Sequence, residues 1–175
     1  MRIVGGEFKG RVINAPDSDL TRPITDKARE AVFNMLGDVS DLLVLDAYAG
    51  SGSLGLEAIS RGAKGVVAID RSKEATKVIA DNVQELGAVD RVEVVNQDIT
   101  NWLEDNIGGS IFDIVFADPP FDELDETELK ELSTYSKRVF VLKHGRKIEP
   151  IEIDDMELIR SRRYGESIVS IYLCK

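Results

Sequence analysis

The chain has 175 residues and a mass of 19.3 kDa, and its 43% hydrophobic and 31% charged residues are typical of one compact globular domain. Its formal charge of -10 argues against broad, nonspecific nucleic-acid binding, because a polyanion is repelled unless positive charge is gathered locally. A single cysteine, Cys174, excludes an internal disulfide, and with a single histidine, His144, we expect no metal site. The apolar runs are too short for a membrane span and the first ten residues lack the apolar core of a signal peptide, so we expect a cytoplasmic protein with no membrane partner.

The first 38 residues predict a small extension ahead of a main domain at residues 39–175. Residues 1–16 alternate around several glycines as a β-hairpin does, and residues 25–37 predict a helix capped by Thr25. Two interpretations of the extension stay open. It is either a packing appendage or a flexible basic arm for a large partner.

The main domain alternates strand and helix along the chain. Runs rich in β-branched or aromatic residues predict strands, at residues 42–46, 65–70, 91–96, 112–117 and 138–143. Helices are expected between them, at 53–62 and at 72–87, where the second places apolar residues on one stripe: Ala75, Val78, Ile79, Val83 and Leu86. This alternation is typical of a mostly parallel twisted sheet with helices on both faces. Residues 148–175 predict a closing antiparallel hairpin.

A glycine-rich loop follows the first predicted strand. Gly50 to Gly55 match the dinucleotide fingerprint G-x-G-x-x-G, and Asp70 lies 20 residues after Gly50, where a ribose-binding acid is expected. A nicotinamide enzyme is therefore a serious alternative, and so is a tight turn without a ligand. However, Asp46 stands at the strand tip, where its charge would repel a pyrophosphate. A carboxylate there suits S-adenosylmethionine, which carries an ammonium and a sulfonium.

The rest of the expected cofactor site comes from the carboxyl ends of successive strands, where open α/β sheets bind ligands. Asp70 is expected to accept hydrogen bonds from the ribose hydroxyls and Asp98 from the adenine amino group, with Ile99 against the ring. The full set of expected cofactor-binding residues is Asp46, Tyr48, Ala49, Gly50, Ser51, Gly52, Asp70, Arg71, Asp98 and Ile99.

Residues 118–121, D-P-P-F, follow an apolar strand at the lip of the predicted sheet. The exocyclic amine of a nucleobase is a poor nucleophile, because its lone pair is delocalised into the ring. An unpaired carboxylate on Asp118 and the carbonyl of Pro119 would accept its N–H bonds, while Pro119 and Pro120 stiffen the backbone and Phe121 stacks on the base. We therefore interpret these four residues as catalytic. Prolines that merely end a strand are the alternative.

Several segments together resemble a known family. DAYAGSGSLGLEAISRGA and DPPF resemble motifs of S-adenosylmethionine-dependent amino-methyltransferases, and with MRIVGGEFKGR, LTRPITDKAREAVFNML and RRYGES the chain resembles the RsmD family of 16S ribosomal RNA guanine-N2 methyltransferases from end to end. The resemblance implies a Rossmann-like class I methyltransferase fold. It also implies methyl transfer to the N2 amine of a guanine in 16S rRNA of the small ribosomal subunit or a late assembly intermediate. Tyr48 and Phe121 depart from the usual family residues but keep an aromatic face.

Contacts to RNA require a local basic face, because the pI of the whole chain is only 4.7. The N-terminal arm and residues 137–147 are the candidates for it. The expected RNA-binding residues are Arg2, Lys9, Arg11, Arg22, Thr25 and Arg29, of which the last three would close the site or meet RNA by the resemblance.

Other features leave the interpretation open. Arg160, Arg162 and Arg163 are either solvent-facing or RNA-facing, Cys174 is expected to be a small core residue, and His144 to end a strand. We expect a monomer. An adenine-N6 methyltransferase on DNA or RNA, and a noncatalytic S-adenosylmethionine-binding adaptor, remain alternatives.

Overall fold

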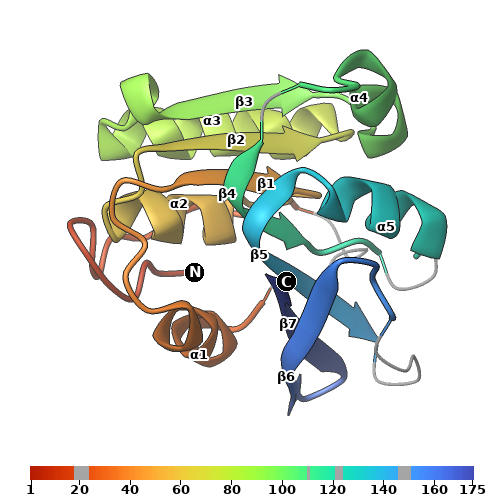
Figure 1. The fold of residues 1–175 in the computed structure, drawn as a ribbon. Coiled ribbons are helices and arrows are strands. Elements are labelled where there is room, and N and C mark those ends of the chain that lie inside the picture. The colour runs from red at the N-terminus through yellow and green to blue at the C-terminus, as the bar shows by residue number, and fades with distance from the viewer. Residues whose placement is uncertain (18–23, 110, 121–123, 146–150) are drawn as a thin grey trace.

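The computed structural model describes residues 1–17, 24–109, 111–120, 124–145 and 151–175. A seven-stranded sheet in the order β3-β2-β1-β4-β5-β7-β6 forms its centre (Figure 1). The strands are β1 (Leu43–Ala47), β2 (Gly65–Asp70), β3 (Val92–Asn96), β4 (Phe112–Ala117), β5 (Ser136–Gly145), β6 (Met156–Tyr164) and β7 (Ser167–Cys174). The first five strands pair in parallel, and β7 pairs antiparallel with both β5 and β6. The predicted parallel sheet and closing hairpin are confirmed.

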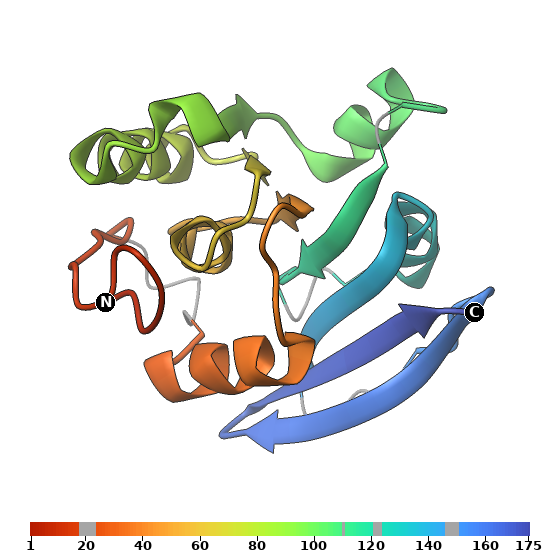
Figure 2. The same ribbon diagram turned by 60° about the vertical axis from the view of Figure 1, so that its left-hand side comes forward.

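Helices cover both faces of the sheet, as expected (Figure 2). The helices are α1 (Asp26–Leu36), α2 (Ser53–Ser60), α3 (Lys73–Leu86), a 3-10 turn η1 (Val89–Arg91), α4 (Ile99–Asp105) and α5 (Glu126–Ser133). Because strand side chains alternate between faces, β1 sends Val44 into the core under α1, α2 and α3, and Leu45 into the core under α4 and α5. The molecule is therefore three layers with the sheet in the middle.

Local signals place the helix ends. Thr25 caps α1 by accepting a hydrogen bond from the Ala28 N–H, and Ser72 caps α3 in the same way through Ala75. On α3 the predicted stripe is buried except for the half-buried Val78, and Thr76 and Asn82 are buried beside it. The buried amide of Asn82 is fully hydrogen-bonded, because it accepts from the Asn14 N–H and donates to the Asn14 carbonyl oxygen.

The N-terminal arm, residues 1–17, packs against the sheet domain. Its expected hairpin is reduced to one antiparallel bridge between Arg2 and Val12, and its apolar residues Ile3, Phe8 and Ile13 join the core around α2 and α3. Gly6 allows a close approach, since a Cβ there would lie 1.7 Å from the Ser60 carbonyl oxygen. These contacts favour the packing appendage over the flexible arm.

Two expectations about the fold need correction. The short helices α4 and α5 were not predicted, because their seven and eight residues are too few to establish a helical period. Cys174 is exposed rather than part of the core, because it lies at the last position of β7 beyond the packed residues. His144 is fully buried within β5, where its ring contacts the Ser170 hydroxyl.

Candidate active site

The glycine loop between β1 and α2 adopts a conformation that needs glycine at two positions. Gly50 has φ 56° and Gly52 has φ 73°, both in the left-handed region, and even Tyr48 is held at φ 59°. A Cβ on Gly52 would also lie 3.1 Å from the Ile79 side chain. Helix α2 begins at Ser53, so the loop delivers backbone N–H groups to the carboxyl edge of the sheet.

Asp70 holds this loop at the end of β2. One carboxylate oxygen accepts from the Gly50 N–H at 2.8 Å, and the other accepts from the Ser72 N–H at 2.8 Å. A carboxylate has about four acceptor positions, so lone pairs remain on both oxygens for further hydroxyl groups. The spacing of 20 residues between Gly50 and Asp70 therefore reflects a direct contact.

Asp46 lies beneath the first turns of α2 and is only 2% exposed. Its carboxylate accepts from the Gly55 N–H at 2.8 Å. Burial, opposed by that hydrogen bond and aided by the negative charges of Asp118 and Asp70, raises the pKa of Asp46 to about 8. Three carboxylates from three neighbouring strands therefore share one electrostatic environment, which favours a cation and disfavours the pyrophosphate of a nicotinamide cofactor.

Asp98 has a local structural role. It caps α4, accepting from the Thr100 N–H at 3.1 Å, and its other oxygen lies 4.0 Å from the Arg71 guanidinium. Ile99 is buried beside it at 4% exposure. Asp98, Ile99 and Arg71 are thus brought to the same edge as the glycine loop, at the ends of β3 and β2.

Tyr48 links the glycine loop to the opposite helical layer. Its hydroxyl donates to one carboxylate oxygen of Glu128 on α5, and the Thr100 hydroxyl donates to the other. Burial, followed by the bond to Glu128, raises the pKa of Tyr48. The sequence did not indicate Glu128, because its partners are 80 and 28 residues away along the chain.

Asp118 follows β4 at the same edge. β4 pairs with β1 so that Ala117 lies opposite Ala47, which places the D-P-P segment beside the glycine loop. Pro119 is buried and Pro120 half-buried. Phe121, the expected stacking residue, lies outside the described residues.

The carboxylate of Asp118 is not unpaired, which corrects the expectation from its sequence. The ammonium of Lys143 lies 2.7 and 2.8 Å from its two oxygens, and the two side chains are only 8% and 21% exposed. Burial raises the pKa of Asp118, while the charge and hydrogen bonds of Lys143 act in the opposite direction. Lys143 is therefore a member of the site that was missed, since it was assigned to a basic surface.

Residues 137–147 do not form the expected basic face over the part that the structure describes. Lys143 and His144 are buried, and Lys137 pairs with Asp113 at 3.1 Å near the amino end of β5. Of the remaining described basic residues, Arg138 is exposed. The reason is that strand alternation and sheet position, rather than charge, decide which of these side chains reach solvent.

The expected RNA contacts lie at different depths. Arg2, Lys9, Arg11 and Thr25 are exposed, and Arg22 lies outside the described residues. Arg29 is 0% exposed, so the expected RNA contact of Arg29 is wrong. Its guanidinium contacts Glu57 at 3.3 Å, Asp26 at 2.8 Å and the Arg2 carbonyl oxygen.

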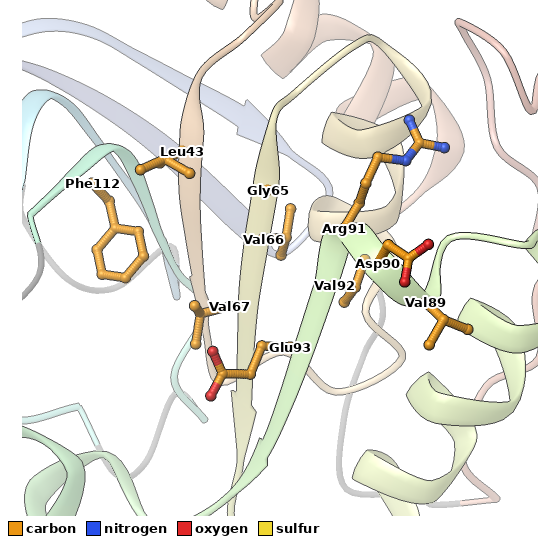
Figure 3. A pocket seen from close by; sticks show the side chains of 10 residues that line it. All are labelled: Leu43, Gly65, Val66, Val67, Val89, Asp90, Arg91, Val92, Glu93 and Phe112. Atoms are coloured by element: carbon orange, nitrogen blue, oxygen red, sulfur yellow. The ribbon is translucent and has the colours of Figure 1, made fainter.

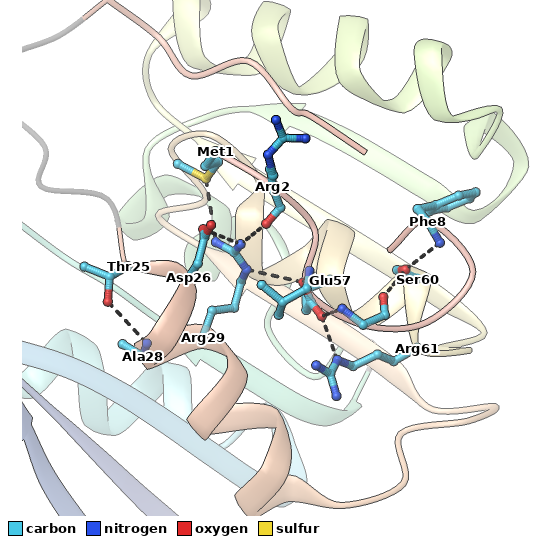
Figure 4. A network of polar contacts seen from close by, with 12 residues as sticks. Met1, Arg2, Phe8, Thr25, Asp26, Ala28, Arg29, Glu57, Ser60 and Arg61 are labelled. Carbon is cyan, nitrogen blue, oxygen red and sulfur yellow. Dashed lines mark hydrogen bonds and ion pairs between the residues drawn. The ribbon is translucent and has the colours of Figure 1, made fainter. Parts of the chain in front are cut away.

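Glu57 on α2 explains why Arg29 is buried (Figure 4). The Glu57 carboxylate accepts from the backbone N–H groups of Val4 and Gly5 at 2.9 and 2.8 Å and pairs with Arg29 and Arg61. A buried carboxylate is tolerated where hydrogen bonds and paired charges satisfy it. This network fixes the N-terminal arm and α1 to α2, the helix that follows the glycine loop.

A separate hollow of about 290 Å³ lies at the other edge of the sheet (Figure 3). It is lined by the first residues of the parallel strands, Leu43, Gly65, Val92 and Phe112. Because ligands of open α/β sheets bind at the carboxyl ends of the strands, this hollow is not part of the candidate site. Within the described ranges no cluster of His, Cys, Asp or Glu could hold a metal ion, and no helix could cross a membrane.

Comparisons with known sequences identify relatives over nearly the whole chain. A family model described as conserved hypothetical protein 95 matches residues 1–173. YlbH of Bacillus subtilis (strain 168), named as a candidate rRNA methyltransferase, is 33% identical over 184 residues that cover 98% of each chain. Ribosomal RNA small subunit methyltransferase D of Escherichia coli (strain K12) is 42% identical over 122 residues, which cover 69% of this chain and 60% of that enzyme.

Solved structures agree with these relatives. The Escherichia coli protein yhhF, described as a candidate methyltransferase, has a TM-score of 0.88 and 31% identity, covering 100% of this chain and 98% of that one. Magnesium protoporphyrin IX methyltransferase from Synechocystis PCC 6803, solved with bound S-adenosylmethionine, has a TM-score of 0.68 over 85% of this chain and 79% of that one, and at 19% identity it shows the shared fold. The predicted Rossmann-like methyltransferase fold is confirmed, and the chain belongs to the RsmD family of ribosomal RNA methyltransferases.

Proposed function

We propose that this protein transfers a methyl group from S-adenosylmethionine to the N2 amine of a guanine in 16S rRNA. One observation carries the proposal. The half-buried carboxylate of Asp118, followed by two prolines, lies at the same sheet edge as the glycine loop and shares its electrostatic environment with Asp46. The names of the family members that act on ribosomal RNA of the small subunit support the choice of substrate.

The residues at the glycine loop fit S-adenosylmethionine, which supplies an electrophilic methyl group when bound. Asp70 keeps free lone pairs for the ribose hydroxyls while its loop contacts hold it in place. Asp46 is poised to ionise, because a nearby cation would lower the pKa that burial has raised to about 8. Tyr48, Ala49, Ser51, Arg71, Asp98 and Ile99 remain proposed cofactor contacts at the same edge.

Asp118 and Pro119 are proposed to prepare the amine. Lys143 donates to both carboxylate oxygens of Asp118, and each oxygen keeps a lone pair that can accept an N–H of the substrate. Two acceptors aimed at the N–H bonds would favour a pyramidal nitrogen, whose lone pair would then be available to the electrophilic methyl group that S-adenosylmethionine would supply. The nitrogen then loses a proton to Asp118 or to solvent. Preorganised groups of this kind act without reorganising during the reaction. Pro120 stiffens the segment, and Phe121 is proposed to stack on the base.

The substrate form and the cellular setting are also part of the proposal. We propose that the substrate is the small ribosomal subunit or its late assembly intermediate. We also propose that the enzyme is a monomer in the cytoplasm. Exposed Arg2, Lys9 and Arg11 on the N-terminal arm, with Thr25 and Arg22, are proposed to approach the RNA.

The direct test maps modified nucleosides in small-subunit rRNA by mass spectrometry, with and without the protein. N2-methylguanosine that appears only with the protein supports the proposal, whereas N6-methyladenosine would replace it with the adenine alternative. Asp118→Ala should lower kcat by about 10²- to 10³-fold and leave calorimetric binding of S-adenosylmethionine nearly unchanged. Asp90→Asn, an exposed carboxylate at the far edge of the sheet, is the matched control and should retain activity. Full activity in Asp118→Ala would contradict the catalytic role.

A further inference from the structure

The outermost strand, β6, carries exposed arginines in a chain that is otherwise acidic. Along β6 the residues from Leu158 to Tyr164 include Arg160, Arg162 and Arg163 and no acidic residue, whereas the whole chain has 32 acidic against 22 basic residues. All three arginines are exposed. Charged side chains also keep an edge strand from pairing with other chains, but a charge of either sign would do this.

Sheet register connects this strand to the candidate active site. Lys143 on β5 lies opposite Val169 on β7, and Val169 lies opposite Arg162 on β6. Residues directly opposite each other in an antiparallel pair point to the same face, so Arg162 faces the same side as Lys143. With strands about 4.8 Å apart, its backbone lies about 10 Å from that of Lys143, the partner of Asp118.

Arg160 points to the same face of the sheet as Arg162, and Arg163 does not. Arg160 lies opposite Ile171, which is opposite Val141, so it shares the face of Arg162. Helix α1 packs on that face over β5 and β7, and its Val32 and Phe33 belong to the same core as Val169 and Ile171 of β7 (Figure 2). Strand β6 is the outermost strand on this side of the sheet, next to β7. Arg163 points to the opposite face and lies 4.0 Å from Glu166.

We propose that Arg160 and Arg162 form a phosphate-binding row that guides the RNA backbone along the outer strand to the amine-binding site at Asp118. The proposal rests on the proposed function, because it assigns the surface that meets the same rRNA. It also gives an acidic protein a local basic face, since Lys143 and His144 of the expected face are buried and Lys137 pairs with Asp113. Arginine suits this role, because its planar group binds phosphate through two hydrogen bonds.

The test compares two variants with equal charge. Arg160→Gln/Arg162→Gln removes the row, and Lys64→Gln/Arg138→Gln removes two exposed charges at the amino ends of β2 and β5, on the far edge of the sheet. Binding to naked 16S rRNA and to small-subunit particles is measured from 50 to 300 mM salt, about the range over which phosphate contacts weaken. Calorimetry of S-adenosylmethionine binding and urea unfolding follow the intact site and fold.

We expect the row variant to bind RNA at least about tenfold more weakly at low salt and to lower the slope of log K against log salt by about 1 to 2, because each phosphate contact contributes about 0.7 to 0.9. Cofactor affinity should be unchanged. An Arg160→Lys/Arg162→Lys variant should keep most of the slope, because it keeps the charge. The far-edge variant should keep the wild-type slope.

Three results would overturn the row. Equal weakening in both glutamine variants would mean that only net charge matters. If the row variant binds RNA as tightly as the wild-type protein does, β6 is not part of the RNA surface. If it binds only the particles more weakly, β6 contacts a protein partner. In both cases methylated guanine in the wild-type reaction would leave the proposed function standing. Failure of the wild-type protein to methylate rRNA would instead refute the proposed function itself.

Discussion

Replacing Lys143 by methionine tests whether the ion pair keeps Asp118 in its acceptor form. Burial raises the pKa of Asp118, whereas the charge and hydrogen bonds of Lys143 lower it, so Lys143 is the group that opposes protonation. In Lys143→Met the pKa of Asp118 should rise further. A protonated carboxyl has lost an acceptor position that the amine needs, so kcat at neutral pH should fall.

The size of the effect follows from the 2.8 Å separation of the charges. Two unit charges at that distance attract by about 6 kcal/mol at an effective dielectric constant of about 20. Most of this attraction offsets the cost of burying both ions. If one quarter remains as a net effect, about 1.5 kcal/mol, the protonation equilibrium changes by about tenfold. We therefore expect the pH at which Asp118 ionises to rise by about one unit, so that kcat on the acid limb falls by up to about tenfold.

The assay is the pH profile of kcat at saturating S-adenosylmethionine and rRNA. Asp118 must be ionised, so kcat rises with pH on the acid side, and in Lys143→Met this rise should move to higher pH while kcat recovers at alkaline pH. Lys143→Arg should restore the wild-type profile. Lys137→Met is the matched control on the same strand, because its half-exposed pair with Asp113 lies at the other end. An acid limb that stays in place in Lys143→Met would refute the reasoning, even if activity falls.

Two further predictions concern stability. Asp46→Asn should raise the free energy of unfolding by about 0.5–2 kcal/mol at pH 8 and weaken binding of S-adenosylmethionine. Because burial raises the folded-state pKa of Asp46 to about 8, the wild-type protein loses stability from pH 4 to pH 8 and the gain of the variant should grow over this range. Urea titrations measure this gain, and a gain that shrinks from pH 4 to pH 8 would contradict the prediction. Glu57→Ala should cost about 3–5 kcal/mol, because it leaves Arg29 charged and fully buried. Its control, Glu7→Ala, breaks a partly exposed pair with Arg91 and should cost at most about 1 kcal/mol, so equal losses in the same titration would argue against the buried network.

The fold was largely predictable because its signals are local. The structure has the strands of the β-branched runs, the cap at Ser72 and the glycine after α3 where they were expected. Each of these signals depends only on neighbouring residues. The helices α4 and α5 were missed because each has only two or three buried apolar residues, too few to establish a period. The N-terminal hairpin was overestimated for a different reason: Gly6 turns the chain onto Ser60, and that partner lies far along the sequence.

In the site, too, residues with local sequence signals could be predicted and residues placed by strand pairing could not. Asp70 could be found from its spacing to Gly50, because in a βαβ unit the next strand returns beside the first at a nearly constant chain length. Lys143 could not be found in this way. Its contact with Asp118 requires that β4 and β5 be neighbours and that Ala117 lie opposite Leu142, since only then are the two following residues adjacent. A register shifted by one residue would turn Lys143 to the other face of the sheet. The charge state of Asp118 therefore depends on strand pairing, which a reading of the D-P-P-F motif alone does not contain.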